Sequence, residues 1–327
     1  MPKSIGLVIG STVGPESLSD TAARAEDAGF DELWLAEDFF FTGGISGANI
    51  ALAATNQIQV GLGVVSAVVR HPALLAMEIA TTARANPGRF QPGIGLGVPA
   101  WMRQMNLLPL SPLSAVRECV SSVRALLDGQ EITESGRVFD FDTVSLGYPQ
   151  TDYVPLHMGV IGPKMLELSG EVADGSILSV AAGVDYIQWA RERIEAGRSK
   201  AGRDQDHRVT VFAIYAVDED SGAAKDKARE TLAFYKTAGG RNALTDVAGI
   251  SDDLVDMASR GGVETVRKEM PERWVEELTV AGSPLEVAEK INLLFEAGAD
   301  SVSLFPATGE DIAATVDITA QQVLSNL

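Results

Sequence analysis

The 327-residue chain contains a single cysteine and only three histidines. One cysteine excludes an internal disulfide framework and any metal site built from several cysteines. Cys119 occupies an apolar position of a helical pattern, which favours core packing over a nucleophilic role. No histidine stands at metal-binding spacing from carboxylates, and the chain has no nucleophile-elbow serine. We therefore expect no metal site and no hydrolase chemistry.

Basic residues are also scarce, because 26 Lys and Arg stand against 45 Asp and Glu, for a formal net charge of −19. A field of that sign repels phosphate backbones and anionic lipid, so we expect neither nucleic acid nor a membrane surface as a partner. No apolar run reaches the ~18 residues of a membrane helix, and no signal peptide precedes the first apolar run. The sequence predicts a cytoplasmic protein that acts on a small molecule.

Hydrophobic residues make up 46% of the chain, and they form short apolar runs that alternate with longer amphipathic ones. Eight strand-like runs, each followed by a helical pattern, predict an α/β fold, the (β/α)₈ TIM barrel. The strand-like runs are 5–9, 33–36, 58–65, 90–96, 155–160, 176–180, 209–217 and 301–305. The main helical patterns are 15–29, 50–56, 72–85, 114–127, 163–172, 185–201, 219–237, 283–297 and 312–324.

Two stretches depart from this rhythm. The alternating stretch 131–146 contains a Ser135-Gly136 turn and predicts a β-hairpin insertion. The polar stretch 239–280 predicts a helical insertion without a strand. Because the helix-strand rhythm resumes afterwards, we expect one domain over 1–327 with these two insertions.

In such barrels the working groups lie at the C-terminal ends of the strands. Glu37 and Asp38 follow the second strand and precede three phenylalanines. A carboxylate beside aromatic rings can have a raised pKa and serve as an acid or base. The alternative is that Glu37 forms a salt bridge and Asp38 caps a turn. We predict Asp38 and Glu37 as the catalytic residues.

Glycines mark the ends of the third, fourth and fifth strands, where they allow close approach of a flat ligand or simply distort the barrel. After the fifth strand, a glycine turn opens a helix whose N–H groups and dipole favour an anion. The predicted cofactor-binding residues are Gly63, Val64, Gly95, Gly97, Val98, Gly159, Ile161, Gly162, Pro163, Lys164 and Ser179.

Several stretches, in their order and spacing, resemble the bacterial-luciferase-like flavin and deazaflavin oxidoreductases. The similarity is strongest to the branch of coenzyme F420-dependent methylenetetrahydromethanopterin reductase, and it covers almost the whole chain. The matching stretches are AEDAGFDELW at 25–34, GLGV at 61–64, RHPA at 70–73, PGRF at 87–90, GIG at 93–95, GPKMLEL at 162–168, ADG at 173–175 and AGSP at 281–284.

The resemblance implies a barrel that holds a flat tricyclic cofactor at its C-terminal mouth, with coenzyme F420 expected and FMN as the alternative. It also implies a non-proline cis peptide at Gly63–Val64 and phosphate-binding loops at 159–164 and 95–98. The family's acidic or histidine residue after the second strand corresponds to Asp38, with Glu37 before it. Relatives are usually dimers, so the resemblance implies a homodimer.

Three functions stay open at this point. The first is hydride transfer between F420 and a small organic substrate, and the second is an FMN-dependent monooxygenase. The third is a catalytically inactive flavin-binding protein. Many relatives carry a histidine after the strand-two acid and an acid after the strand-four glycines, where this chain has Phe39 and Val98-Pro99. The site is therefore expected to be more apolar than that of a pterin reductase, and the natural substrate stays open.

Overall fold

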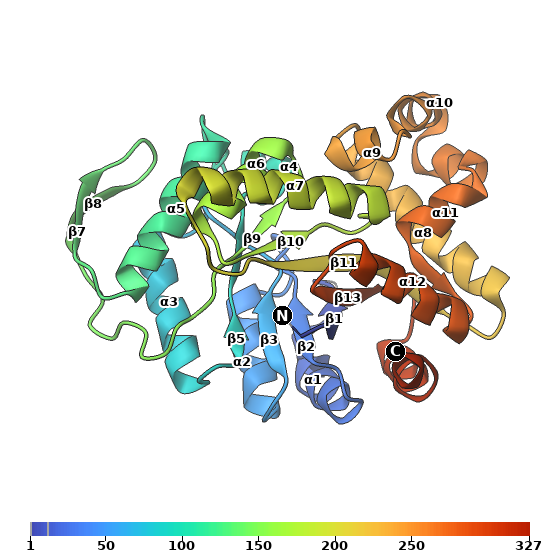
Figure 1. Ribbon diagram of the computed structural model, residues 1–327, viewed down its shortest axis with the longest axis horizontal. Helices are drawn as coiled ribbons and strands as arrows, with labels where there is room; N and C mark the ends of the chain where they lie inside the picture. Colours follow the sequence, from blue (N-terminus) through green and yellow to red (C-terminus); the bar gives the residue numbers. More distant parts are fainter. Residues whose placement is uncertain (1, 12) are drawn as a thin grey trace.

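Eight parallel strand positions close into a ring in the computed structural model, which describes residues 2–11 and 13–327 (Figure 1). Two positions are each divided into two short strands, β3 with β4 and β5 with β6. The ring closes because β3 pairs with β5 and β4 pairs with β6. The strands are β1 Ser4–Ile9, β2 Glu32–Leu35, β3 Gln59–Leu62, β4 Val65–Ser66, β5 Phe90–Gln91, β6 Gly93–Gly95, β9 His157–Val160, β10 Gly175–Leu178, β11 Arg208–Val217 and β13 Ser301–Pro306. The predicted (β/α)₈ barrel is confirmed.

Helices surround this ring because parallel strands need a covering layer on the outer face as well as a filled interior. The helices are α1 Leu18–Asp27, α2 Gly44–Ala54, α3 Pro72–Ala85, α4 Pro99–Gln104, α5 Pro112–Leu127, α6 Pro163–Val172, α7 Val184–Ala201, α8 Ser221–Gly239, α9 Ala243–Val247, α10 Ser251–Glu269, α11 Glu272–Leu278, α12 Pro284–Glu296 and α13 Ile312–Ile318. Proline occupies the first turn of α3, α5, α6 and α12, where its missing N–H costs little.

The sequence prediction for α2 was wrong at its start, since the helix begins at Gly44 and not at residue 50. Gly44 and Gly47 are poor helix formers, so the local pattern places them in a loop. In the fold, a Cβ on Gly44 would lie 2.9 Å from the Glu37 side chain, and one on Gly47 would lie 3.3 Å from Leu18. Close packing thus overrides the low helix propensity. The short helix α4 was also absent from the prediction.

Two groups of elements stand outside the ring. Strands β7 Ile132–Ser135 and β8 Asp140–Val144 form an antiparallel hairpin that projects at the left of Figure 1. Helices α9, α10 and α11 lie at the opposite side, where α10 and α11 pack with α8 around the buried Trp274 and α9 contacts α7. The short strand β12, Val280–Gly282, pairs in parallel with the C-terminal end of β11. The sequence predicted no strand there.

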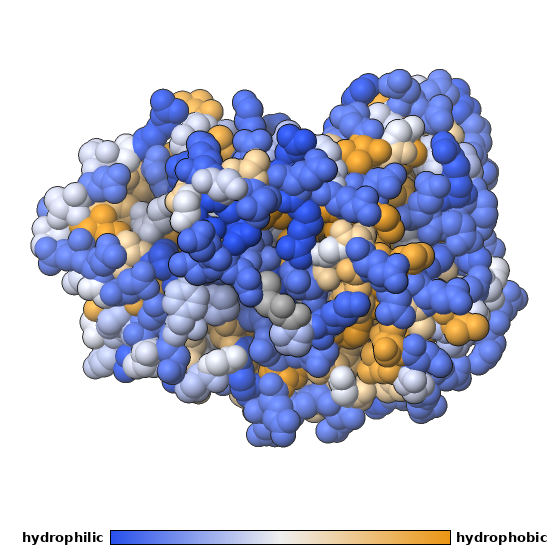
Figure 2. Space-filling model, in the orientation of Figure 1, coloured by the Kyte–Doolittle hydropathy of each residue, from blue (hydrophilic) through white to orange (hydrophobic). Residues whose placement is uncertain are grey.

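The surface in Figure 2 is mostly hydrophilic, with hydrophobic side chains gathered over α12 and the C-terminal segment. On α12, Leu285 and Leu293 are 62% and 51% exposed. None of the helices in the described part of the chain has both the length and the apolar character that crossing a membrane requires.

The N-terminal end of the barrel is closed by a buried polar network around Glu32. Its carboxylate accepts hydrogen bonds from Trp34 Nε1 at 2.9 Å and from Ser301 Oγ at 2.7 Å, and it pairs with the Arg208 guanidinium. Arg208 also donates to Ser4 Oγ at 2.9 Å. A buried ion pair is tolerated when further hydrogen bonds compensate both charges, and this one links β1, β2, β11 and β13.

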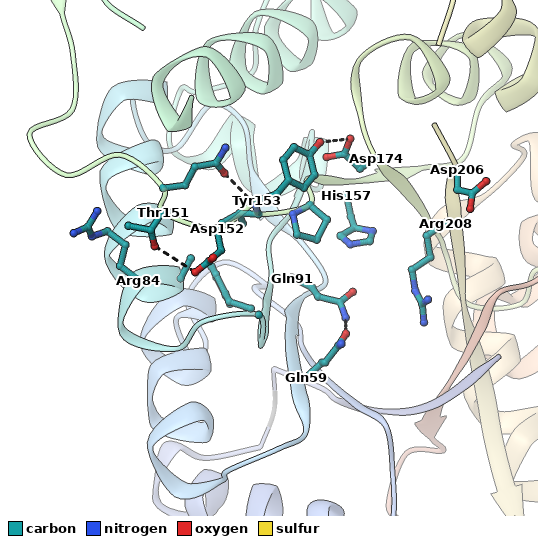
Figure 3. Close-up of a pocket in the computed structure, with 16 residues that line it drawn as sticks. Gln59, Arg84, Gln91, Thr151, Asp152, Tyr153, His157, Asp174, Asp206 and Arg208 are labelled. Carbon is teal, nitrogen blue, oxygen red and sulfur yellow. Dashed lines mark hydrogen bonds between the residues drawn. The ribbon is translucent and has the colours of Figure 1, made fainter. Parts of the chain in front are cut away.

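A cavity of about 320 Å³ lies beside this network (Figure 3). Figure 3 shows the amides of Gln59 and Gln91 bonded to each other, with the His157 ring and Arg208 around the same space. The lining residues come from the beginnings of strands, the loops before them and the end of α3, and none of the predicted site residues is among them. In these barrels that end carries stability, not chemistry.

Buried His157 couples the stability of this end to pH. Its ring is 1% exposed and packs edge-on against Trp34, with 5.7 Å between the ring centroids. Burial lowers the pKa of His157 to about 4, and the charge of Arg208 adds to this effect. The imidazole is therefore neutral in the folded protein near neutral pH.

We expect acid to destabilise the protein through this histidine. The unfolded chain binds the proton below its ordinary pKa of 6.5, whereas the folded chain resists it down to about 4. Stability is thus lost as pH falls through that window, by about 2 kcal/mol at pH 5. Urea unfolding at pH 7 and pH 5 measures this loss, and His157→Gln should reduce it. An equal loss in both proteins would contradict the assignment.

Candidate active site

The centre of the C-terminal mouth is formed by Val64, which follows a cis peptide bond at Gly63–Val64 between β3 and β4. This is the bond that the family resemblance implies. A Cβ on Gly95 would lie 2.6 Å from Val64 Cγ2, and one on Gly159 would lie 3.0 Å from both Val64 methyl groups. The glycines of the fourth and fifth strand positions therefore leave the space that the Val64 side chain fills.

An apolar cluster lies beneath Val64 and fills the barrel interior. Trp34 and Phe212 pack edge to face, with 5.7 Å between their ring centroids, and Val8 and Ile177 belong to the same cluster. A Cβ on Gly63 would lie 2.5 Å from the Phe212 ring, so a side chain there would require the ring to move. Val64, Val180 and Phe305 pack on top of this cluster. The floor of the mouth is consequently a hydrophobic surface.

The two predicted catalytic carboxylates have different surroundings. Both Glu37 oxygens accept hydrogen bonds from Arg70, at 2.8 and 3.0 Å, and Oε2 also accepts the Gly44 N–H at 2.9 Å. The Glu37 side chain is 8% exposed. Such a bidentate pair fixes the carboxylate in place. Glu37 thus holds Arg70 and the first turn of α2.

Asp38 is half-buried, and its Oδ2 accepts a hydrogen bond from Ser11 Oγ at 2.6 Å. The next residue, Phe39, is buried, and its ring centroid lies 6.1 Å from that of Trp101. Phe40 is exposed and has a φ of 74°. Ser11 follows β1, so it holds Asp38 at the mouth from the neighbouring strand. A carboxylate with one anchored oxygen can orient a substrate hydroxyl or exchange a proton with it.

Tyr235 and Phe305 also lie at the mouth, although neither was among the predicted site residues. The Tyr235 ring on α8 packs edge-on against Phe305 at the end of β13, with 5.7 Å between centroids. Burial raises the pKa of Tyr235 to about 12, and the negative charge of Asp38 adds to the effect. The phenol is therefore neutral at physiological pH and able to donate a hydrogen bond.

Ser11 could have been found from the sequence by taking the residues that follow every strand, the first included. Tyr235 had no comparable signal, because it lies in the middle of a helical pattern. Only the direction in which α8 packs brings its side chain over Phe305.

The predicted anion-binding turn precedes α6. The carbonyl of Gly162 accepts the N–H groups of Met165 and Leu166 at 3.1 and 3.0 Å, and the Ile161 carbonyl accepts Tyr186 Oη at 2.6 Å. These bonds fix the turn. Pro163 and Lys164 are exposed in the first helical turn, where the N-terminal N–H groups and the helix dipole favour an anion.

The remaining predicted residues lie around the rim. Gly97 is half-buried with a φ of 95°, a left-handed conformation that suits glycine. Val98 is 41% exposed, and Ser179 is half-buried after β10. In residues 2–11 and 13–327, no three His, Cys, Asp or Glu side chains gather into a possible metal site. The described mouth combines an apolar floor, one anchored carboxylate and an exposed helix start, which together fit a flat anionic cofactor.

Substitution of Gly95 tests whether this glycine leaves the space that the Val64 side chain fills. Gly95→Ala should lower the free energy of unfolding by about 1–3 kcal/mol, because the new methyl overlaps a Val64 methyl in a packed region. In a Val64→Ala background the same change should cost markedly less. Urea denaturation of both single variants and the double variant measures the coupling. Additive effects would show that the two side chains do not compete for one space.

Comparison with known proteins gives consistent matches along the chain. A family model described as luciferase-like monooxygenase matches residues 5–301. The chain is 30% identical to the 5,10-methylenetetrahydromethanopterin reductase of Archaeoglobus fulgidus, over 93% of each protein. It is 26% identical to the F420-dependent glucose-6-phosphate dehydrogenase of Nakamurella multipartita, over 96% of this chain and 93% of that protein. The coenzyme F420-dependent tetrahydromethanopterin reductase of Methanopyrus kandleri shares the fold, with a TM-score of 0.87 at 24% identity and 99% coverage of each chain.

Proposed function

This chain belongs to the luciferase-like monooxygenase family, as its motifs predict, and we propose that it is an oxidoreductase that transfers a hydride between coenzyme F420 and a small organic substrate. The observation that carries the proposal is the Val64 side chain, which packs against the glycines of the neighbouring strands at the same end of the barrel as Asp38. Relatives named for F420 extend over nearly the whole chain, which favours the deazaflavin over FMN.

The residues at the mouth are suited to hold that cofactor. We assign Val64 to support the flat ring, while Gly95, Gly97 and Gly159 allow its close approach. Beside them Val98, Ile161 and Ser179 complete the walls. The turn from Gly162 through Pro163 to Lys164 offers helix N–H groups and a cation to its phosphate. When bound, the cofactor supplies or accepts a hydride, and the protein orients the substrate against it.

We assign Asp38 the role of exchanging a proton with the substrate oxygen. Its Oδ2 bond to Ser11 orients the carboxylate, and no residue in 2–11 or 13–327 donates a hydrogen bond to the other carboxylate oxygen. Glu37 is assigned a supporting role, because Arg70 and the Gly44 N–H occupy its oxygens. A proton-transfer group of this kind contributes about 10²–10⁴-fold to a rate.

We further propose that 1–327 is one domain and that the protein is a cytoplasmic homodimer. Exposed apolar side chains support a subunit contact, since Leu74 and Met77 on α3 are 55% and 49% exposed. Light scattering should then give twice the monomer mass of 34.6 kDa. A mass of 34.6 kDa at micromolar concentration would contradict the dimer.

Titration with F420 and with FMN, followed by absorbance and tryptophan fluorescence, tests the proposed function. We expect saturable binding of F420, with FMN much weaker. Asp38→Asn should retain F420 binding and lower turnover by about 10²–10⁴-fold, because it removes the group that exchanges the proton. Asp152→Asn, an exposed change at the opposite end of the barrel, should alter neither quantity.

Three other outcomes would each change the conclusion. FMN binding without F420 binding would favour the monooxygenase. F420 binding without turnover of any acceptor would favour an inactive flavin-binding protein. Unchanged turnover in Asp38→Asn would remove Asp38 from the reaction.

A further inference from the structure

The cavity at the N-terminal end of the barrel is lined by buried polar groups that the rest of the protein leaves without partners. His157 is 1% exposed, and within residues 2–11 and 13–327 neither of its ring nitrogens has a hydrogen-bond partner. In the same part of the chain, Oε1 of Gln91 and Nε of Arg208 also have none. Buried polar atoms are nearly always hydrogen-bonded, so three such groups around one cavity indicate a ligand.

The register of the strands holds these groups at one level of the barrel. Gly175 on β10 pairs with His157 on β9 and with Arg208 on β11. Because Gly175 has no side chain, the imidazole lies over it, and a Cβ there would be 2.3 Å from His157 Nδ1. Below the imidazole in Figure 3, the Gln91 amide is bonded to that of Gln59. The polar lining is therefore fixed by β3, β5, β9 and β11.

The outer wall of the cavity lies at the surface. Thr151, Asp152 and Tyr153 line it from the loop before β9, and all three are exposed. The Tyr153 ring is held in place, because its hydroxyl donates to Asp174 Oδ1 at 2.7 Å and the Arg124 guanidinium lies 4.4 Å from its centroid. The volume of about 320 Å³ is at the lower end of the range of about 300–1,000 Å³ for ligand pockets. The cavity therefore suits a small molecule that enters from this side.

The charges inside the cavity are compensated by other protein groups. Arg208 pairs with Glu32, and Asp174 accepts hydrogen bonds from Arg124 and Arg203 at 2.8 and 2.9 Å. An anion would meet the Asp174 carboxylate, and a cation would meet the Arg208 guanidinium. The other charged lining residues are exposed, and they are Arg84, Asp152 and Asp206. An uncharged ligand is therefore favoured.

The three unpartnered groups need both donors and acceptors from that ligand. Gln91 Oε1 only accepts, and Arg208 Nε only donates. The His157 imidazole is neutral, since burial lowers its pKa to about 4, so one ring nitrogen donates and the other accepts. A hydroxyl group does both, and several hydroxyl groups on one small molecule can match all three residues. A ligand with carbonyl groups alone would leave Gln91 Oε1 without a donor.

We propose that this cavity binds a small uncharged polyol of monosaccharide size, whose hydroxyl groups bond to Gln91, His157 and Arg208. None of the residues assigned to the mouth lines the cavity, so this second site is independent of the proposed function. The ligand undergoes no reaction there. Its binding stabilises the folded protein, because the unfolded chain has no such cavity.

The test uses myo-inositol, a cyclic polyol, as the probe, added to the full chain labelled with ¹⁵N in histidine. The chain has only three histidines, so their imidazole NMR signals are few, and His157→Gln identifies those of His157. Saturating myo-inositol should shift the His157 signals. Those of His71 should not move, because His71 caps the start of α3 and the cavity lies at the end of that helix.

A substitution in the lining tests the predicted hydrogen bonds. Gln91→Leu removes the acceptor with little change in volume, so the dissociation constant of myo-inositol should rise about tenfold. Gln188→Leu is the matched control, since Gln188 is exposed on α7 and does not line the cavity. The titration of the unsubstituted protein decides the proposal even if Gln91→Leu does not fold.

Four results would overturn the inference. The first is myo-inositol leaving the His157 signals unchanged, and the second is a shift at His71 without one at His157, which would place the polyol elsewhere. The third is a response of His157 to sulfate or tetramethylammonium but not to myo-inositol, which would make the ligand an ion. The fourth is equal affinity in Gln91→Leu and the unsubstituted protein. None of these results involves F420, so the proposed function is tested separately.

Discussion

The contact between Val64 and the glycines of the neighbouring strands is the interaction on which the mouth of this barrel depends. It requires side-chain-free positions on two adjacent strands, Gly95 and Gly159, at the level where the third strand position is interrupted. Larger residues at either place would meet the Val64 methyl groups. Because protein interiors are packed without spare volume, the shape of the floor follows from this single arrangement.

The N-terminal end of the barrel contributes to stability, and the C-terminal end carries the residues assigned to the chemistry. At the N-terminal end, Glu32 and Arg208 form a buried ion pair tied to several strands, and His157 is kept neutral by burial. At the C-terminal end the interior is apolar, and among the described residues Ser11 donates to one oxygen of the Asp38 carboxylate. Charges that are fully engaged stabilise the ring, whereas a carboxylate with a free oxygen can take part in a reaction.

The difference between Glu37 and Asp38 illustrates what a linear pattern can and cannot indicate. Their position after the second strand predicts correctly that they belong near the mouth. Both residues lie in the loop after β2, and the two carboxylates meet different neighbours there. Arg70, in the loop before α3, pairs with Glu37, and Ser11, in the loop after β1, donates a hydrogen bond to Asp38. Neither partner is adjacent in sequence, and no local rule ranks one carboxylate above the other.

The sequence by itself determined the order of the eight strand positions and the main helices, the barrel and the family, because hydrophobic periodicity and glycine turns are local properties repeated in each βα unit. It also indicated the glycine positions of the floor. Only the tertiary structure decided that Gly44 begins α2, that Glu37 is bound to Arg70, and that Tyr235 lies over Phe305. These features arise when segments far apart in the chain are brought together by ring closure. Their cause is therefore packing between elements, which no pattern within one element contains.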